Sequence, residues 1–281
     1  MRKLISLLLM LILLVTLIGC GEKAGEKGQM NEGESETKEL DPNQTEVFQI
    51  RQDPLPFEVV IKSLRPVGKE IAKQTPAKAF RVSENPYDQS FAIGVISADA
   101  VMAISSQDET KLRSYTEVLI EYSKNIGLKD EILMMADEIQ SVLGTNNADK
   151  WERLEELIIK YQIEVELALY EADMLDQFTL MQLGGWSEGL YRISSMYLEN
   201  WDEKGAKIIN QKGIVNSLIN NLQYIKSNKI KEAKYYSLAS EGYAKIKDII
   251  YSVGDDQFYT KDDLNHVNKI TKEIVESIQK K

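Results

Sequence analysis

Few residue types in this chain are equipped for covalent or metal chemistry. The 281 residues include one cysteine, Cys20, and one histidine, His266. A single cysteine excludes an intrachain disulfide framework and cysteine-rich zinc modules, and a single histidine excludes multi-histidine metal sites. Catalysis would have to rely on carboxylates, hydroxyls, lysine or tyrosine. His266, between Asn265 and Val267 in a polar segment, is expected at the surface.

Carboxylate pairs, which enzymes use for general acid–base catalysis, are plentiful. We consider Glu164 with Glu166, Asp173 with Asp176, and Asp255 with Asp256. General acid catalysis needs one carboxyl of such a pair to be buried, so that its pKa rises. These pairs lie among other charged residues, which favours solvated helix faces, and the third lacks the spaced oxygen ligands of a calcium loop. The sequence therefore predicts no catalytic residue, no metal site and no cofactor.

Two long segments are almost free of charge. Between residues 89 and 107 only Asp99 is charged, and between residues 178 and 198 only Glu188 and Arg192 are. A helix that is apolar on every side is normally buried. An isolated buried charge is too costly, so Asp99 must be paired, hydrogen-bonded or neutral. We predict that Asp99 and Arg192 meet across a helix crossing, with Glu188 competing for the same guanidinium from the i, i+4 position.

The same segments allow two interpretations. Gly184-Gly185-Trp186 places small residues beside a large aromatic one, which suits either a close helix crossing or a shallow pocket. The first interpretation is a buried core that contains one structural ion network. The second is a pocket for a small ligand or a cation. Its lining residues would be Asp99, Trp186, Glu188, Tyr191 and Arg192.

The body of the chain has the pattern of an all-α protein. All six prolines precede residue 87, and proline is disfavoured in helix interiors. From Leu154 to Thr179 apolar or small residues recur at alternating steps of four and three, the period of an amphipathic helix. Short connections predict antiparallel neighbours in a multi-helix bundle or a stack of helical hairpins. We expect eight or nine helices, near residues 56–74, 86–105, 108–126, 129–143, 148–183, 185–200, 203–226, 229–253 and 261–279.

Capping signals mark several of these helix ends. Asn85 before Pro86 is a helix start. Capping boxes are predicted at Ser106 with Glu109 and at Thr260 with Asp263. Glycines at the expected C-terminal caps are Gly127, Gly144 and Gly254.

The segments around Asp99 and Glu188 share a weak internal similarity. At an offset of 90 residues Gly94 aligns with Gly184, whereas at an offset of 89 Asp99 aligns with Glu188. The two registers compete. Both an internal duplication and a chance likeness of two helices rich in small residues stay open.

The N-terminus carries an export signal. Arg2 and Lys3 precede an apolar run, Leu4 to Ile18, which has the length of a signal-peptide core and is short for a membrane-spanning helix of about 20 residues. The run ends in Leu17-Ile18-Gly19-Cys20, and polar chain follows. This motif resembles the lipobox of bacterial lipoproteins, and the resemblance covers residues 1–20 only.

Membership of that class would imply cleavage after Gly19 and acylation of Cys20. Three acyl chains anchor a protein stably to a bilayer. The protein would be anchored on the exported side of the membrane. In a Gram-negative cell the outer membrane would be favoured, because Gly21 is not aspartate. The expected segments are a signal peptide at 1–19, a lipidated Cys20 with a flexible acidic tether to residue 54, and one helical domain at 55–281.

The net charge of the chain limits the kinds of partner that it can bind. The formal charge of −10, or −12 once Arg2 and Lys3 are removed, argues against nucleic acid as a partner. We expect a lipid-anchored helical module of the bacterial cell envelope that is not an enzyme and binds a protein partner or acts as an accessory factor. The alternative is a lipoprotein that binds a small ligand or a cation, and a carboxylate-pair hydrolase of envelope glycans ranks third.

Overall fold

The computed structural model describes residues 67–254 and 257–279. All of them belong to the larger of two compact units, Pro42–Lys281. Every regular element among the described residues is a helix, which confirms the expected all-α class. The predicted signal peptide, Cys20, the tether and the helix start near residue 56 lie outside the described residues. So do Asp255 and Asp256.

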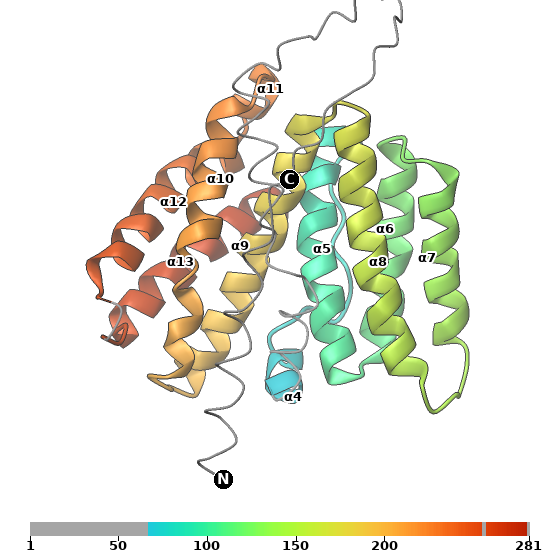
Figure 1. Cartoon of the computed structure of the whole chain (residues 1–281), viewed down its shortest axis with the longest axis horizontal. Helices are drawn as coiled ribbons and strands as arrows, with labels where there is room; N and C mark the ends of the chain where they lie inside the picture. Colours follow the sequence, from blue (N-terminus) through green and yellow to red (C-terminus); the bar gives the residue numbers. More distant parts are fainter. Residues whose placement is uncertain (1–66, 255–256, 280–281) are drawn as a thin grey trace, which may run out of the picture. The chain divides into compact units, whose positions relative to one another are not determined.

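The helices follow one another through short connections, and successive long helices run in opposite directions (Figure 1). Two segments that were each predicted as one helix, near 203–226 and 229–253, are each divided in two. The 3-10 helix η2 precedes α10, and the short helix α11 precedes α12. The bounds are α4 (Gly68–Ala72), α5 (Pro86–Ser106), α6 (Glu109–Asn125), α7 (Asp130–Leu143), α8 (Lys150–Glu171), α9 (Leu175–Glu199), η2 (Gly205–Ile209), α10 (Lys212–Tyr224), α11 (Asn228–Lys231), α12 (Lys234–Ser252) and α13 (Lys261–Gln279).

Several predicted caps are confirmed. The side chain of Asn85 accepts a hydrogen bond from Tyr87 N at 3.0 Å, at the start of α5. Before α13, Asp263 N donates to Thr260 Oγ1 at 3.1 Å, and Thr260 N donates to Asp263 Oδ2 at 2.8 Å. Gly127 follows α6 with a φ of 82°, a conformation that favours glycine at a helix C-terminus.

The capping box predicted at Ser106 and Glu109 is wrong. Ser106 is the last residue of α5, and Gln107 follows it with a left-handed φ of 59°. The N-cap of α6 is Asp108, whose carboxylate accepts a hydrogen bond from Lys111 N at 3.0 Å. The neighbouring aspartate thus caps the helix in place of the serine.

The break between α8 and α9 also differs from the prediction, which placed it at residue 184. The chain turns at residues 172–174 instead. Asp173 adopts a left-handed φ of 56°, and Met174 N donates to Leu169 O at 2.8 Å, the hydrogen bond that closes many helix C-termini. The apolar period continues across this turn, so the period alone does not reveal it.

The long helices form two four-helix units. The first consists of α5, α6, α7 and α8, and the second consists of α9, α10, α12 and α13 (Figure 1). In each unit the first helix packs against the second and the fourth, and the third packs against the same two. The helices α5 and α9, the first of each unit, form the seam between the units. The two halves share the order of the helices and the pairs of neighbouring helices, but α5 packs mainly against α6, the second helix of its unit, whereas α9 packs mainly against α13, the fourth of its unit.

At the seam the backbones of α5 and α9 touch. A Cβ atom at Gly94 would lie 1.9 Å from Met181 O, and one at Gly184 would lie 2.2 Å from Phe91 O. The two contacts are reciprocal at an offset of 90 residues, because Gly94 corresponds to Gly184 and Phe91 to Met181. This offset therefore relates the two helices in space, and they run parallel. Gly184 and Gly185 permit the close approach and do not break the helix.

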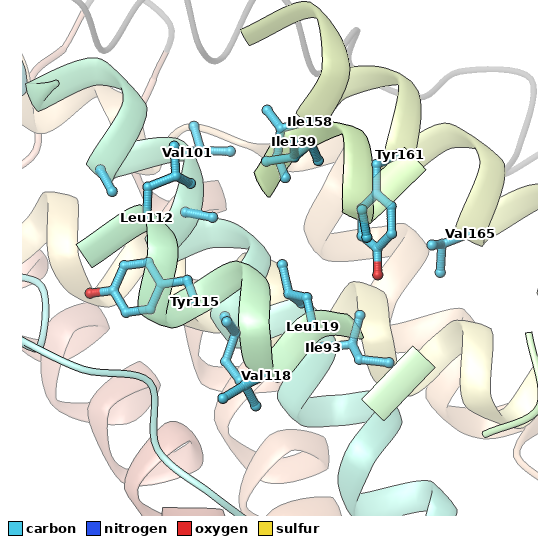
Figure 2. Close-up of a cluster of buried hydrophobic side chains, with 14 of the residues drawn as sticks. Ile93, Val101, Leu112, Tyr115, Val118, Leu119, Ile139, Ile158, Tyr161 and Val165 are labelled. Atoms are coloured by element: carbon cyan, nitrogen blue, oxygen red, sulfur yellow. The ribbon is translucent and has the colours of Figure 1, made fainter. Parts of the chain in front are cut away.

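Each unit has an apolar core of its own, and α5 contributes to both. Ile93 and Ile96 of α5 belong to the first core, whereas Phe91 and Val95 belong to the second. This division explains why α5 is apolar on every side. The side chains of the first core shown in Figure 2 are Ile93, Val101, Leu112, Tyr115, Val118, Leu119, Ile139, Ile158, Tyr161 and Val165.

Among the described residues, one helix is long and apolar enough to cross a membrane by length and composition alone. It is α5, Pro86–Ser106, and 83% of its apolar window is buried inside the domain. A core helix of a water-soluble domain has the same composition, so this finding is weak evidence for a membrane span.

The seam contact predicts opposite effects for two glycine-to-alanine substitutions. Gly94→Ala should lower the free energy of unfolding by about 1–3 kcal/mol or more, because the new methyl group forces the two backbones apart. Gly189→Ala, in the interior of α9, places its Cβ where nothing lies within 4 Å and should raise stability by up to about 1 kcal/mol through helix propensity. Urea unfolding measures both. Equal effects of the two substitutions would show that the seam is not closely packed.

Candidate functional site

Three charged side chains meet at the seam between α5 and α9. Arg192 Nε lies 2.5 Å from Glu188 Oε1 and 3.9 Å from Asp99 Oδ1. The side chains of Asp99 and Glu188 are 2% and 0% exposed, and that of Arg192 is 12% exposed. The predicted meeting of Asp99 and Arg192 is confirmed, and Glu188, the predicted competitor, makes the shorter contact. We refer to Asp99, Glu188 and Arg192 as the seam cluster.

The seam glycines position this cluster. Asp99 follows Gly94 by five residues, and Glu188 follows Gly184 by four. Each carboxyl group therefore lies a little more than one helical turn beyond the point where the two parallel backbones touch. Arg192 is one further turn along α9 and reaches back to Glu188 within its own helix. The spacing brings both carboxyl groups to the same level of the seam.

Burial and mutual repulsion set the protonation of the two carboxyl groups. Burial raises the pKa of Asp99 well above its ordinary value, Glu188 raises it further, and Arg192 opposes both effects. Burial also raises the pKa of Glu188, while Arg192 and the hydrogen bond with Asp99 lower it. Burial lowers the pKa of Arg192, but the neighbouring Glu188 and Asp99 outweigh this and raise it. The cluster is neutral when Asp99 holds a proton and Glu188 is ionised beside Arg192.

Two buried oxygens of the cluster have no hydrogen-bond donor within the described part of the chain. Among the residues that the structure describes, no donor reaches Asp99 Oδ1 or Glu188 Oε2 with a hydrogen bond. A proton held between the two carboxyl groups supplies the missing donor. Without it, two carboxylates would face one guanidinium inside the protein, and one negative charge would remain uncompensated.

Two polar side chains of α6, those of Lys111 and Tyr115, lie near the seam cluster. Lys111 Nζ donates to Thr75 O at 3.0 Å and to Thr75 Oγ1 at 2.9 Å. Tyr115 OH donates to Pro76 O at 2.5 Å. Burial raises the pKa of Tyr115, and the charge of Asp99 raises it further. These bonds tie the connection between α4 and α5 to α6, close to the seam cluster.

Residues of α13 hold the other side of the site. The guanidinium carbon of Arg192 lies 4.5 Å from the ring centre of Tyr191, and Lys272 Nζ lies 6.0 Å from the same ring centre. Both distances are within the range of a cation–π interaction. Asn268 Nδ2 donates to Tyr191 O at 3.0 Å and to Ser195 Oγ at 2.7 Å. Helix α13 thereby fixes the turn of α9 that carries Arg192.

The five residues predicted to line a pocket do not all come together. Asp99, Glu188 and Arg192 form the cluster, and Tyr191 packs against Arg192. Trp186 precedes Glu188 by two residues, which places it on nearly the opposite side of α9, and it packs against the second core. Trp186 therefore does not belong to the site.

The other acid–base candidates that the structure describes do not form a buried charged cluster with one another. His266 and Asp173 are exposed. Asp176 accepts hydrogen bonds from Lys226 N at 3.1 Å and from Ser227 N at 2.9 Å, so it closes the connection between α10 and α11. Within residues 67–254 and 257–279 no group of three or more His, Cys, Asp and Glu side chains could hold a metal ion.

Sequence reasoning missed three residues that surround the cluster. Asn268 had a readable signal, because its amide lies on the apolar face of α13, one turn from both Leu264 and Thr271. Lys111 and Tyr115 had none, since on α6 they fit an ordinary amphipathic pattern.

Comparison of the chain with protein-family models, with curated proteins and with solved structures finds no match. The function has to be argued from the residues and their geometry.

The seam cluster predicts a pH dependence of stability with a definite sign. The raised pKa of Asp99 means that the folded chain keeps a proton that the unfolded chain loses near pH 4. Stability should therefore fall as the pH rises above about 4 through the folded-state pKa, by up to about 1.4 kcal/mol per pH unit for one proton. Asp99→Asn removes this contribution. The free energy of unfolding of the variant, relative to that of the wild type, should therefore increase as the pH rises. Urea unfolding between pH 5 and 8 measures the difference, and parallel profiles would contradict a protonated Asp99.

The short contact between Arg192 and Glu188 predicts strong energetic coupling. Arg192→Met should cost about 3–5 kcal/mol, because it leaves the Glu188 carboxylate buried without a partner. The double variant Glu188→Met, Arg192→Met should cost less than Arg192→Met alone. Coupling between Asp99→Asn and Arg192→Met should be smaller, since the raised pKa of Asp99 favours its neutral form and Asp99 Oδ1 lies 3.9 Å from Arg192 Nε. Chemical unfolding of the single and double variants gives both coupling energies, and strict additivity would reject the network.

Proposed function

We propose that this chain is a lipid-anchored helical module of the bacterial cell envelope that acts by binding a protein partner and not by catalysis. The N-terminal sequence supports the anchor, through the resemblance of Leu17-Ile18-Gly19-Cys20 to a lipobox. One structural observation supports the module. The cluster with the most strongly perturbed carboxyl groups, Asp99 and Glu188, is closed inside the seam.

Closure of this cluster bears on the choice between enzyme and binding module. A general acid or a nucleophile must reach the substrate, and Glu188 is fully buried and already ionically paired. The Asp99 proton neutralises the cluster internally. Such an arrangement stabilises the contact between two helical units, and it leaves the outer helix surfaces as the parts that meet other molecules.

A second candidate function is the binding of a cation at the seam. The observation in its favour is that Asp99 Oδ1 and Glu188 Oε2 accept no hydrogen bond from any described group. A cation would occupy the place that we assign to the proton, and the two would compete. Thermal unfolding with and without Na⁺, K⁺, Mg²⁺ and Ca²⁺ at constant ionic strength separates the two functions. A stabilisation specific to one ion, and lost in Asp99→Asn, would favour cation binding.

The anchor is tested at Cys20. In a bacterial host fed with a labelled fatty acid, the wild-type chain should incorporate the label and lose residues 1–19. Cys20→Ala should remain an unlabelled precursor, because lipoprotein processing needs the thiol. Gel mobility, label and mass of the N-terminal peptide measure all three. A soluble mature chain with an unmodified cysteine would exclude the lipid anchor and the localisation that follows from it.

A further inference from the structure

Charge is distributed very unevenly over the two four-helix units. Residues 107–173, which form α6, α7 and α8, contain sixteen acidic and seven basic side chains. Residues 204–240, which form η2, α10, α11 and the start of α12, contain seven lysines and one acidic residue, Glu232. The two groups of helices lie on opposite sides of the seam helices α5 and α9 (Figure 1). One segment of an acidic chain is thus strongly basic.

The basic charge is densest around α11. Four lysines lie within nine residues there, and all four are exposed. We call this set the α11 corner: Lys226, Lys229, Lys231 and Lys234. Glu232, which is exposed, lies within this set, and the carboxylate of Asp176 contacts it through hydrogen bonds from two backbone amides.

The corner is held rigidly by the core beneath it. Ile225 and Ile230 are 2% and 0% exposed and belong to the second core. The Asp176 carboxylate fixes the chain between them through the amides of Lys226 and Ser227. Since the backbone is already ordered, the lysines lose little entropy when they meet a charged surface. Helix α10 extends this surface, and its thirteen residues contain no acidic side chain.

We propose that the α11 corner docks the helical domain onto an anionic lipid surface, with the acidic α6–α8 side held away from the bilayer. The proposal rests on the proposed lipid anchor, because the anchor brings the domain within reach of a membrane. Clusters of four or more lysines near an anionic bilayer bind it electrostatically, with an effect that falls off within a Debye length, about 10 Å at 0.1 M salt. The acidic side is repelled by the same surface. The two effects act together to set one orientation.

The test uses a chain that begins at residue 20, carries Cys20→Ser and therefore has no acyl group. Co-sedimentation is measured with vesicles of phosphatidylcholine alone and with vesicles that contain about one third phosphatidylglycerol. The chain with all four lysines should bind the anionic vesicles at least tenfold more strongly than vesicles of phosphatidylcholine alone. Raising the salt from about 0.1 to 0.5 M should abolish this difference. Replacing all four lysines of the α11 corner by glutamine should lower binding to anionic vesicles at least tenfold.

A matched variant changes the same number of charges elsewhere. It replaces four lysines by glutamine outside the corner, at Lys78, Lys124, Lys129 and Lys160, which are all exposed. This variant should change binding less than twofold. An equal loss in both variants would assign the effect to net charge and overturn the proposal, as would equal binding to both vesicle types. Retention on a soluble polyanion without binding to vesicles would overturn it in favour of a polymer. Because the test protein is not acylated, none of these outcomes depends on whether Cys20 is a lipid anchor.

Discussion

The backbone contact between α5 and α9 is the constraint on which the rest of the domain depends. Gly94 and Gly184 bring the two helices so close that a Cβ at either position would overlap a carbonyl oxygen of the other helix. One turn further on, the side chains of Asp99 and Glu188 are 2% and 0% exposed, so their charges have to be compensated inside the protein. Arg192 lies next to both carboxyl groups, and burial raises the pKa of Asp99, which favours its neutral form. The close contact at the two glycines and the burial of the cluster are features of the same seam.

The two four-helix units place this seam close to an axis of approximate symmetry. The glycine contacts repeat at an offset of 90 residues, as duplication of one unit requires. The charged residues break the symmetry, because at this offset Asp99 corresponds to Gly189 and not to Glu188. A symmetric seam would carry either no carboxyl group or an equivalent pair without a specific cation. The single Arg192 fits only the asymmetric arrangement. The glycine contact thus follows the offset of 90 residues, whereas the seam cluster departs from it.

Local signals in the sequence were sufficient for most of the fold but not for the seam. Caps at Asn85 and Thr260 depend on a few adjacent residues and were predicted correctly. Gly184 was misread as a helix break, because its role depends on a backbone carbonyl about 90 residues away. The pairing of Asp99 with Arg192 was predictable by elimination, as few charges occupy the apolar segments. Trp186 is close to Glu188 in sequence but packs against the second core, on nearly the opposite side of α9.

The charged groups that remain exposed determine where the domain can contact other molecules. Arg192 lies next to both carboxyl groups of the seam cluster, and the cluster is almost closed to solvent, so it offers little surface to a protein partner. The outer surface carries the uncompensated charge, acidic on α6–α8 and basic around α11. A domain on a tether of several tens of residues would otherwise tumble above the membrane. An anionic bilayer would attract the lysines around α11 and repel the acidic helices α6–α8. This difference favours one orientation, in which α6–α8 faces away from the membrane. If the tether and this orientation both hold, the acidic face of α6–α8 is the surface on which a protein partner would be met.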